Sequence, residues 1–139
     1  MEFLYRAMME ENELPKPGAT ATKLGVRRGK DIEVDDEGNV HRPEFRVGER
    51  NGVSCAPSVL DLPGFAMPAE WDGTNRKTRV WRIAVDDLPA DLTAEQDGPS
   101  HISIGPAHTM SFDDFNKSIQ STRSRWEIVV PTGSRTHDT

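Results

Sequence analysis

The first residues of the chain place a charged side chain inside an apolar run. Positions 3–7 have the aromatic and aliphatic composition of a β-strand. Because side chains alternate between the two faces of a strand, Phe3 and Tyr5 share one face, and Leu4 and Arg6 share the other. Arg6 is therefore drawn toward a half-buried surface, where a guanidinium needs an anion. The alternative is an edge strand whose arginine reaches water along its alkyl stem.

The composition favours a single compact α+β domain with short elements. The chain has 139 residues, enough for one domain that buries a core without disulfides or metal. Only 35% of the residues are hydrophobic, and 11 glycines and 10 prolines imply much loop. With 23 acidic and 17 basic residues the net charge is −6, which argues against a nucleic-acid surface.

Cysteine and histidine usage argues against structural metal and disulfides. Cys55 is the only cysteine, so a reducing compartment is expected, and the four histidines lie far apart. No apolar run approaches the ~18 residues of a membrane span. Charged residues within the first eleven positions also interrupt any secretory signal. We expect a cytoplasmic protein, acting in the cell that makes it or in a target cell, which could also be secreted without a cleaved signal.

Short strands and turns account for most of the chain. The clearest strand is 79–85, where apolar and other side chains alternate. We interpret 8–22 and 86–92 as loops or turns, and 96–99 as a reversal. Further strands are expected at 24–26, 52–55 and 101–104, with a hairpin formed by 31–34 and 40–41.

An amphipathic helix is predicted near the C-terminus. Ser111 is placed to cap it, with Asp114 three residues later. Its apolar stripe is typical of a core contact rather than of a cofactor site and consists of Phe112, Phe115, Ile119 and Trp126. We predict one domain over 1–130 and a flexible tail over 131–139.

Three polar residues on separate predicted strands share a chemical logic. Phosphate-binding glycine loops, dinucleotide fingerprints and zinc-protease motifs do not occur. Arg6, Ser54 and His101 could together hold a dinucleotide, with Arg6 on phosphate, Ser54 fixing the geometry and His101 near the reacting sugar. Ser54 lacks the glycine-flanked turn of a hydrolase nucleophile, so we discount that chemistry.

This order of residues resembles the ADP-ribosyltransferase-like toxins, and in particular the Tse2-like cytotoxic effectors of the type VI secretion system. The resemblance rests on positions 4–7, 52–54, 87–92, 96–97, 101–107, 110 and 126–127. It implies a split β-sandwich with an NAD cleft, and a toxin that is neutralised by a cognate immunity protein. It also implies catalytic roles for Arg6, Ser54 and His101, and NAD contacts from Tyr5, Arg6, Gly52, Val53 and Ser54.

Two positions depart from the transferase pattern. Val53 stands where a hydroxyl residue generally precedes the serine, and His101 stands where the pattern has a glutamate. A glutamate bonds the ribose and favours a positively charged transition state, whereas a neutral histidine contributes less negative potential. Glu95 or Asp97 could substitute for it.

Other readings of the same residues stay open. Arg6 could pair with Glu33 or Asp86, and Ser54 and His101 could be ordinary strand residues. Tyr5, Trp81 and Cys55 are expected in the core. One alternative function is a non-enzymatic interaction module that docks a partner through the irregular, proline-rich segment 57–74. Another is a ribonuclease toxin that uses His41 and His101 as acid and base.

Overall fold

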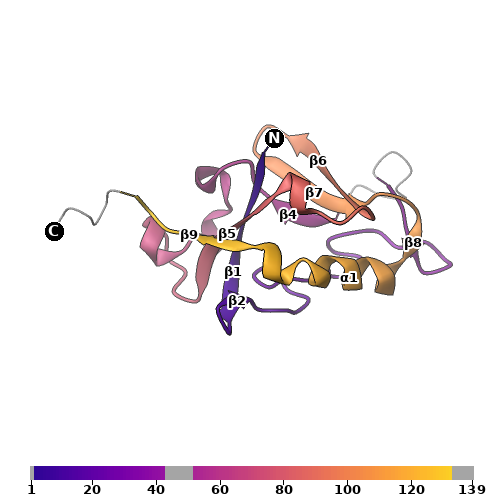
Figure 1. Cartoon of the computed structure of the whole chain (residues 1–139), viewed down its shortest axis with the longest axis horizontal. Helices are drawn as coiled ribbons and strands as arrows, with labels where there is room; N and C mark the ends of the chain where they lie inside the picture. The colour runs from indigo at the N-terminus through magenta and orange to yellow at the C-terminus, as the bar shows by residue number, and fades with distance from the viewer. Residues whose placement is uncertain (1, 43–51, 133–139) are drawn as a thin grey trace.

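Two antiparallel β-sheets and a short two-stranded ladder form the body of the molecule (Figure 1). The structure is a computed structural model that describes residues 2–42 and 52–132. The larger sheet has the order β2 (Leu14–Pro15), β1 (Phe3–Glu11), β5 (Thr78–Ala84) and β9 (Glu127–Val129). The smaller sheet has the order β4 (Val53–Cys55), β7 (His101–Pro106) and β6 (Leu92–Gly98), and the ladder pairs β3 (Asn39–Val40) with β8 (Met110–Ser111).

Strand β1 places Arg6 inside the protein, as its alternation predicts. Leu4 and Arg6 are buried on one face, while Phe3 and Tyr5 are only partly covered. The strand is longer than predicted and pairs with β5 from Phe3 to Met9. The prediction of a loop from position 8 is therefore wrong, because the chain continues to a tight turn at 12–13 and returns as β2.

A β-bridge joins the two sheets, between β1 and the residue that follows β4. The amide of Tyr5 donates to the carbonyl of Ala56 at 2.9 Å, and the amide of Ala56 donates to the carbonyl of Tyr5 at 2.8 Å. This bridge brings Arg6 next to Ser54, two residues that are 48 positions apart. The fold thus joins two of the three predicted site residues.

The smaller sheet confirms two predicted strands and adds one that was missed. β4 and β7 pair from Val53↔Ile104 to Cys55↔Ile102. The sequence predicts only a turn over 86–92 and a reversal over 96–99, with no strand assigned between them. β6 is a strand along the open edge of β7, where exposed polar side chains are tolerated. Its register shifts between Gln96 and Gly98, which makes Asp97 the extra residue of a bulge.

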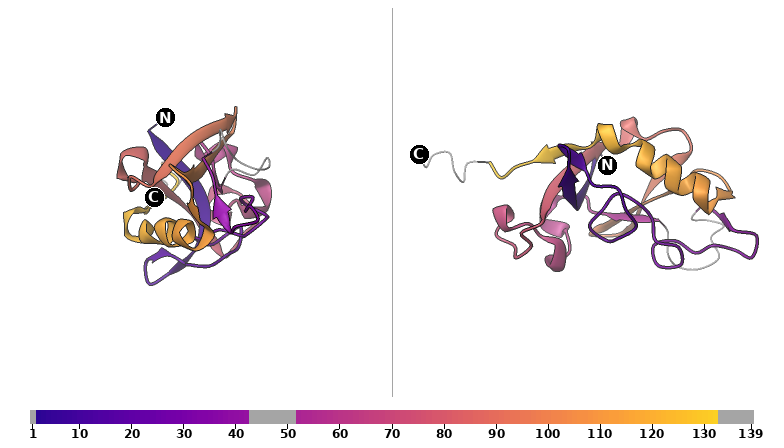
Figure 2. Two further views of the ribbon diagram at one scale, coloured as in Figure 1. Left: turned by 90° about the vertical axis from the view of Figure 1, so that its right-hand side faces the viewer. Right: turned by 90° about the horizontal axis from the view of Figure 1, so that it is seen from below.

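Helix α1 (Phe112–Ser121) closes one side of the core, and Figure 2 shows it on the outside of the molecule. The predicted cap is confirmed, since the Ser111 hydroxyl accepts from the amide of Asp114 at 3.0 Å. Phe115 and Ile119 are buried, as expected. Trp126 is also buried, but it follows the 3₁₀ turn η6 (Arg123–Arg125) rather than lying on α1. The described residues therefore form one compact α+β domain.

Several local predictions need correction. The glycine turn at 35–39 exists, but β3 pairs with β8 rather than forming the predicted hairpin. Residues 24–26 are buried without forming a strand. Segment 57–74 contains the short 3₁₀ helices η2 (Val59–Asp61), η3 (Gly64–Ala66) and η4 (Ala69–Trp71), and η5 (Val85–Asp87) follows β5.

Some predictions concern features that the structure describes only in part. Positions 133–139 of the predicted tail lie outside the described residues. Among the residues that are described, no helix has the length and apolar character needed to cross a membrane.

Candidate functional site

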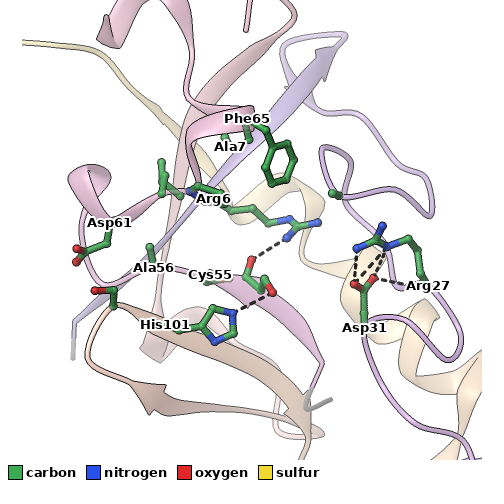
Figure 3. Close-up of a pocket in the computed structure, with 15 residues that line it drawn as sticks. Arg6, Ala7, Arg27, Asp31, Cys55, Ala56, Asp61, Phe65 and His101 are labelled. Carbon is green, nitrogen blue, oxygen red and sulfur yellow. Dashed lines mark hydrogen bonds and ion pairs between the residues drawn. The ribbon is translucent and has the colours of Figure 1, made fainter. Parts of the chain in front are cut away.

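A pocket of about 410 Å³ opens where the two sheets meet (Figure 3). Arg6, Ser54 and His101, the three residues predicted to carry the chemistry, all line it. Its volume falls in the range of about 300–1,000 Å³ that is usual for small-molecule sites. Other polar or aromatic lining residues are Arg27, Asp31, Asp61, Phe65 and Ser100.

The Arg6 guanidinium is held by main-chain oxygens rather than by a carboxylate. It donates to the carbonyl of Ser54 at 2.7 Å, to that of Lys23 at 2.9 Å and to that of Thr20 at 3.4 Å. These bonds tie the first strand to the serine strand and to the loop before Leu24. The proposed ion pairs with Glu33 or Asp86 are not among its contacts, so that interpretation is wrong.

Arg6 has one buried donor nitrogen that is not satisfied by the described residues. Arg6 is only 6% exposed, and its Nε has no hydrogen-bond partner in the described part of the chain. Burial lowers the pKa of the guanidinium, while the negative charge of Asp31 acts in the opposite direction. A buried cation whose hydrogen-bond partners are neutral carbonyls is costly. An anionic group in the pocket would relieve that cost.

The second arginine of the pocket is already neutralised. Arg27 donates from its side chain to both carboxylate oxygens of Asp31, at 2.9 and 3.2 Å, and from its amide at 2.7 Å. The hydrogen bond to Asp31 raises the pKa of Arg27. This two-pronged ion pair has the geometry that arginine prefers with carboxylates. Arg6 is therefore the pocket arginine whose charge is not balanced by a hydrogen-bonded carboxylate.

Strand β4 exposes the side chain of Ser54, whereas the side chains of both its neighbours are buried. Val53 and Cys55 are buried on the core side of the strand, and Ser54 is exposed on the other side. The backbone at Gly52 has φ of +138°, and a Cβ there would lie 2.0 Å from the carbonyl oxygen of Ile104. A glycine is required for β4 to lie this close to β7.

Hydrogen bonds connect four polar side chains of the smaller sheet in series, beginning at Ser54. His101 Nε2 lies 3.0 Å from Ser54 Oγ, and His101 Nδ1 lies 2.6 Å from Asp97 Oδ1. Ser103 Oγ donates to the other carboxylate oxygen of Asp97 at 2.6 Å. Figure 3 draws dashed lines from Arg6 and from His101, and both of these hydrogen bonds are to Ser54 of β4. The site thus has a cationic end and an acidic end.

Three of the residues expected to contact NAD do not line the pocket. Tyr5 lies on the opposite face of β1 from Arg6 and packs on a small apolar cluster. Val53 belongs to the hydrophobic core, and Gly52 is buried under β7. The burial of Val53 also explains the first departure from the transferase pattern, because a hydroxyl at this position would face the core.

The alternative ribonuclease chemistry, which needs His41 close to His101, is not supported by the pocket. His41 Nε2 lies 2.7 Å from Asp35, and His41 Nδ1 lies 2.9 Å from Thr109, whereas the pocket lining does not include His41. The acid–base pair proposed for a ribonuclease is therefore not formed with His101. In the described ranges, the acidic, histidine and cysteine side chains form no group of three that could hold a metal ion.

Sequence reasoning named Asp97 only as one of two possible acids and missed its partner Ser103. The available signal is the spacing of four between Asp97 and His101 across a Gly-Pro turn. The bulge that aims Asp97 at His101 has no signature in the sequence. Arg27, Asp31 and Asp61 were missed because they come from loops and 3₁₀ turns, whose paths depend on tertiary contacts.

These features define a small α+β domain in which a buried arginine, a strand serine and a strand-opening histidine share one pocket. The family model described as the Tse2 ADP-ribosyltransferase toxin matches residues 4–126. The chain belongs to this family, which confirms the predicted resemblance, and the match includes Arg6, Ser54 and His101. No curated protein and no solved structure matches the chain.

Proposed function

We propose that the protein is a bacterial toxin that binds NAD, breaks its nicotinamide–ribose bond and transfers ADP-ribose to a cellular target. The observation that carries the proposal is that Arg6, Ser54 and His101 line one pocket in a member of an ADP-ribosyltransferase toxin family. In this proposal the two sheets that meet at the Tyr5–Ala56 bridge are the halves of a split β-sandwich.

The charges of the pocket suit the two ends of such a substrate. The buried cation Arg6, whose hydrogen-bond partners are carbonyls rather than carboxylates, suits a phosphate of NAD. Ser54 lies between Arg6 and His101, and the side chains of Ser54 and His101 offer hydrogen bonds to ribose hydroxyls. Cleavage of the nicotinamide–ribose bond develops positive charge on the sugar, which a nearby acidic group stabilises. The target, a neutralising immunity protein and action in the cytosol are further parts of this proposal.

The proposal is tested by measuring nicotinamide release from NAD by the purified protein, and growth of bacteria that express it. Ser54→Ala and His101→Ala should each lower release by about 100-fold and relieve toxicity. Both side chains are solvent-accessible, so these variants should fold. Ser58→Ala is a matched control, because Ser58 is a nearby exposed serine whose hydroxyl contacts Asp61 rather than His101. Wild-type release in His101→Ala would contradict the proposal.

A second candidate function rests on the order Ser54–His101–Asp97. A serine, a histidine and an aspartate joined by hydrogen bonds at 3.0 and 2.6 Å have the arrangement of nucleophilic hydrolases. This geometry reopens the chemistry that the sequence had discounted. A fluorophosphonate probe would label Ser54 in this case. Labelling that survives in Ser100→Ala but not in Ser54→Ala would support it, and absence of labelling would exclude it.

A further inference from the structure

The bulge in β6 places a carboxylate behind the histidine of the pocket. Gln96 pairs with Ile102 and Gly98 pairs with His101, so Asp97 is the extra residue between them. Bulges change the direction of a side chain, and they are common beside active sites. Here the bulge brings Asp97 Oδ1 to 2.6 Å from His101 Nδ1. Asp97 itself does not line the pocket.

The hydrogen bonds that link Asp97 and His101 determine which ring nitrogen of His101 carries the proton. A carboxylate only accepts hydrogen bonds, so His101 Nδ1 must carry a proton and donate to Asp97. A neutral imidazole has one donor and one acceptor nitrogen, which leaves Nε2 as an acceptor on the pocket side. Ser103, which is buried, donates to the second oxygen of Asp97 and holds the carboxylate in place.

From this arrangement we infer that Asp97 and His101 act as one unit that supplies the acidic function of the site. When substrate binds, the Ser54 hydroxyl, which lies 3.0 Å from His101 Nε2 in the free protein, turns away and Nε2 accepts a hydrogen bond from a ribose hydroxyl instead. The Asp97 charge, acting through the ring, stabilises positive charge on the sugar. Asp97 is then a positioning residue and His101 the residue that touches substrate. This inference rests on the proposed function and identifies the carboxylate that His101 lacks.

Two acidic residues of β6, Asp97 and Glu95, are candidates for the acid that acts on the pocket. Burial is the main cause of the raised pKa of the pocket residue Cys55, and the negative charge of Asp97 contributes to it. Glu95 and Asp97 are both exposed residues of the same strand and neither lines the pocket, but Asp97 contacts the pocket residue His101 at 2.6 Å. Asp97 is therefore the acid coupled to the site, and Glu95 offers a matched control for the loss of one negative charge.

Two measurements test the inference in the full-length protein. The first is the tautomer of His101, read from its ring ¹⁵N chemical shifts at neutral pH. The expected result is a proton on Nδ1 in the wild type and in Glu95→Gln. In Asp97→Asn, an amide that keeps the Ser103 bond turns its NH₂ toward the ring and moves the proton to Nε2. A wild-type ring protonated on Nε2 alone would overturn the inference.

The second measurement is nicotinamide release from NAD. Asp97→Asn should lower the rate by about 100-fold, with no change in Glu95→Gln. The double variant Asp97→Asn/His101→Glu places a carboxylate directly at the pocket beside an amide donor, and it should regain at least part of the lost rate. Wild-type activity in Asp97→Asn, or no recovery in a folded double variant, would contradict the inference.

Failure of the proposed function gives a different result from failure of the inference. If the wild type releases no nicotinamide, the proposed function fails, and the inference fails with it, whatever the tautomer. If the wild type releases nicotinamide and Asp97→Asn does so equally fast, only the inference fails. The ¹⁵N spectrum also reports whether each variant is folded, so a loss of activity through unfolding is recognised.

Discussion

At the scale of single residues, Arg6 is as important for the architecture of the site as for its charge. Its guanidinium joins the carbonyls of Thr20, Lys23 and Ser54, which belong to two different segments. Removing it leaves buried carbonyl groups without donors, and each such group is costly. A loss of toxicity in Arg6→Ala would therefore not by itself reveal a catalytic role, and the exposed Ser54 and His101 are better test positions.

We predict that Arg6→Ala lowers the free energy of unfolding by roughly 2–4 kcal/mol, measured by urea denaturation. Arg82→Ala on the neighbouring strand is the control, because Arg82 forms a surface pair with Glu127 at 2.7 Å. Exposed pairs of this kind contribute no more than about 1 kcal/mol. Equal destabilisation by the two substitutions would show that the carbonyl contacts of Arg6 are not important for folding.

Cys55 gives a second prediction, on the dependence of stability on pH. Burial raises the pKa of its thiol from 9.0 to about 12. Between these values the unfolded thiol loses its proton while the folded thiol keeps it, so the folded state loses stability as pH rises. The contribution is about 1.4 kcal/mol per pH unit.

The measurement compares urea unfolding of the wild type and Cys55→Ala at pH 8 and at pH 10. The wild type should lose more stability than the variant, because other groups titrate alike in both proteins. A thiol reagent should also react with the wild type only after unfolding. Identical pH dependence in the two proteins, or rapid labelling of the native thiol, would contradict the prediction.

At the scale of elements, the close contact between β4 and β7 depends on Gly52. Any side chain there meets the carbonyl of Ile104, and the φ of +138° is unfavourable for other residues. We predict that Gly52→Ala destabilises the protein by about 2–4 kcal/mol and lowers activity, because Ser54 is displaced. Thermal unfolding and nicotinamide release are the measurements.

Gly64→Ala is the matched control for that substitution. Gly64 has no atoms within 4 Å of the added Cβ and no positive φ. Its effect on stability should stay within about 0.5 kcal/mol. If Gly52→Ala is as stable as Gly64→Ala, the two strands must be able to separate without loss, and the tight contact would not be what holds Ser54 in place.

The elements that sequence predicts well are those with a local cause. The strands β1 and β5, predicted from alternating side chains, and the helix cap at Ser111 depend on residues that are close in sequence, and the structure confirms them. β6 pairs with its sequence neighbour β7, but its polar side chains lack the apolar alternation of a predicted strand, and the pairing of β3 with β8 joins distant segments, so neither was found. The candidate site shows the same division. Ser54 and His101 follow from strand alternation, whereas the direction of Asp97 depends on a bulge against β7.

At the scale of the whole molecule, the pocket lies where two sheets meet at a β-bridge, so a ligand there contacts both. A ligand that binds only the folded state raises stability according to its concentration relative to its dissociation constant. At 100 times that constant the gain is about 2.7 kcal/mol, which corresponds to a rise in melting temperature of about 10 °C for a domain of this size.

We predict that ADP-ribose, which lacks the scissile bond to nicotinamide, raises the melting temperature in a concentration-dependent way. Nicotinamide riboside, which lacks phosphate, should raise it much less, because it brings no anion to the charge of Arg6, whose hydrogen-bond partners are neutral carbonyls. Scanning calorimetry with each ligand measures both effects. Equal stabilisation by the two ligands would show that Arg6 does not bind phosphate. No stabilisation by ADP-ribose at millimolar concentration would show that the pocket does not bind the dinucleotide.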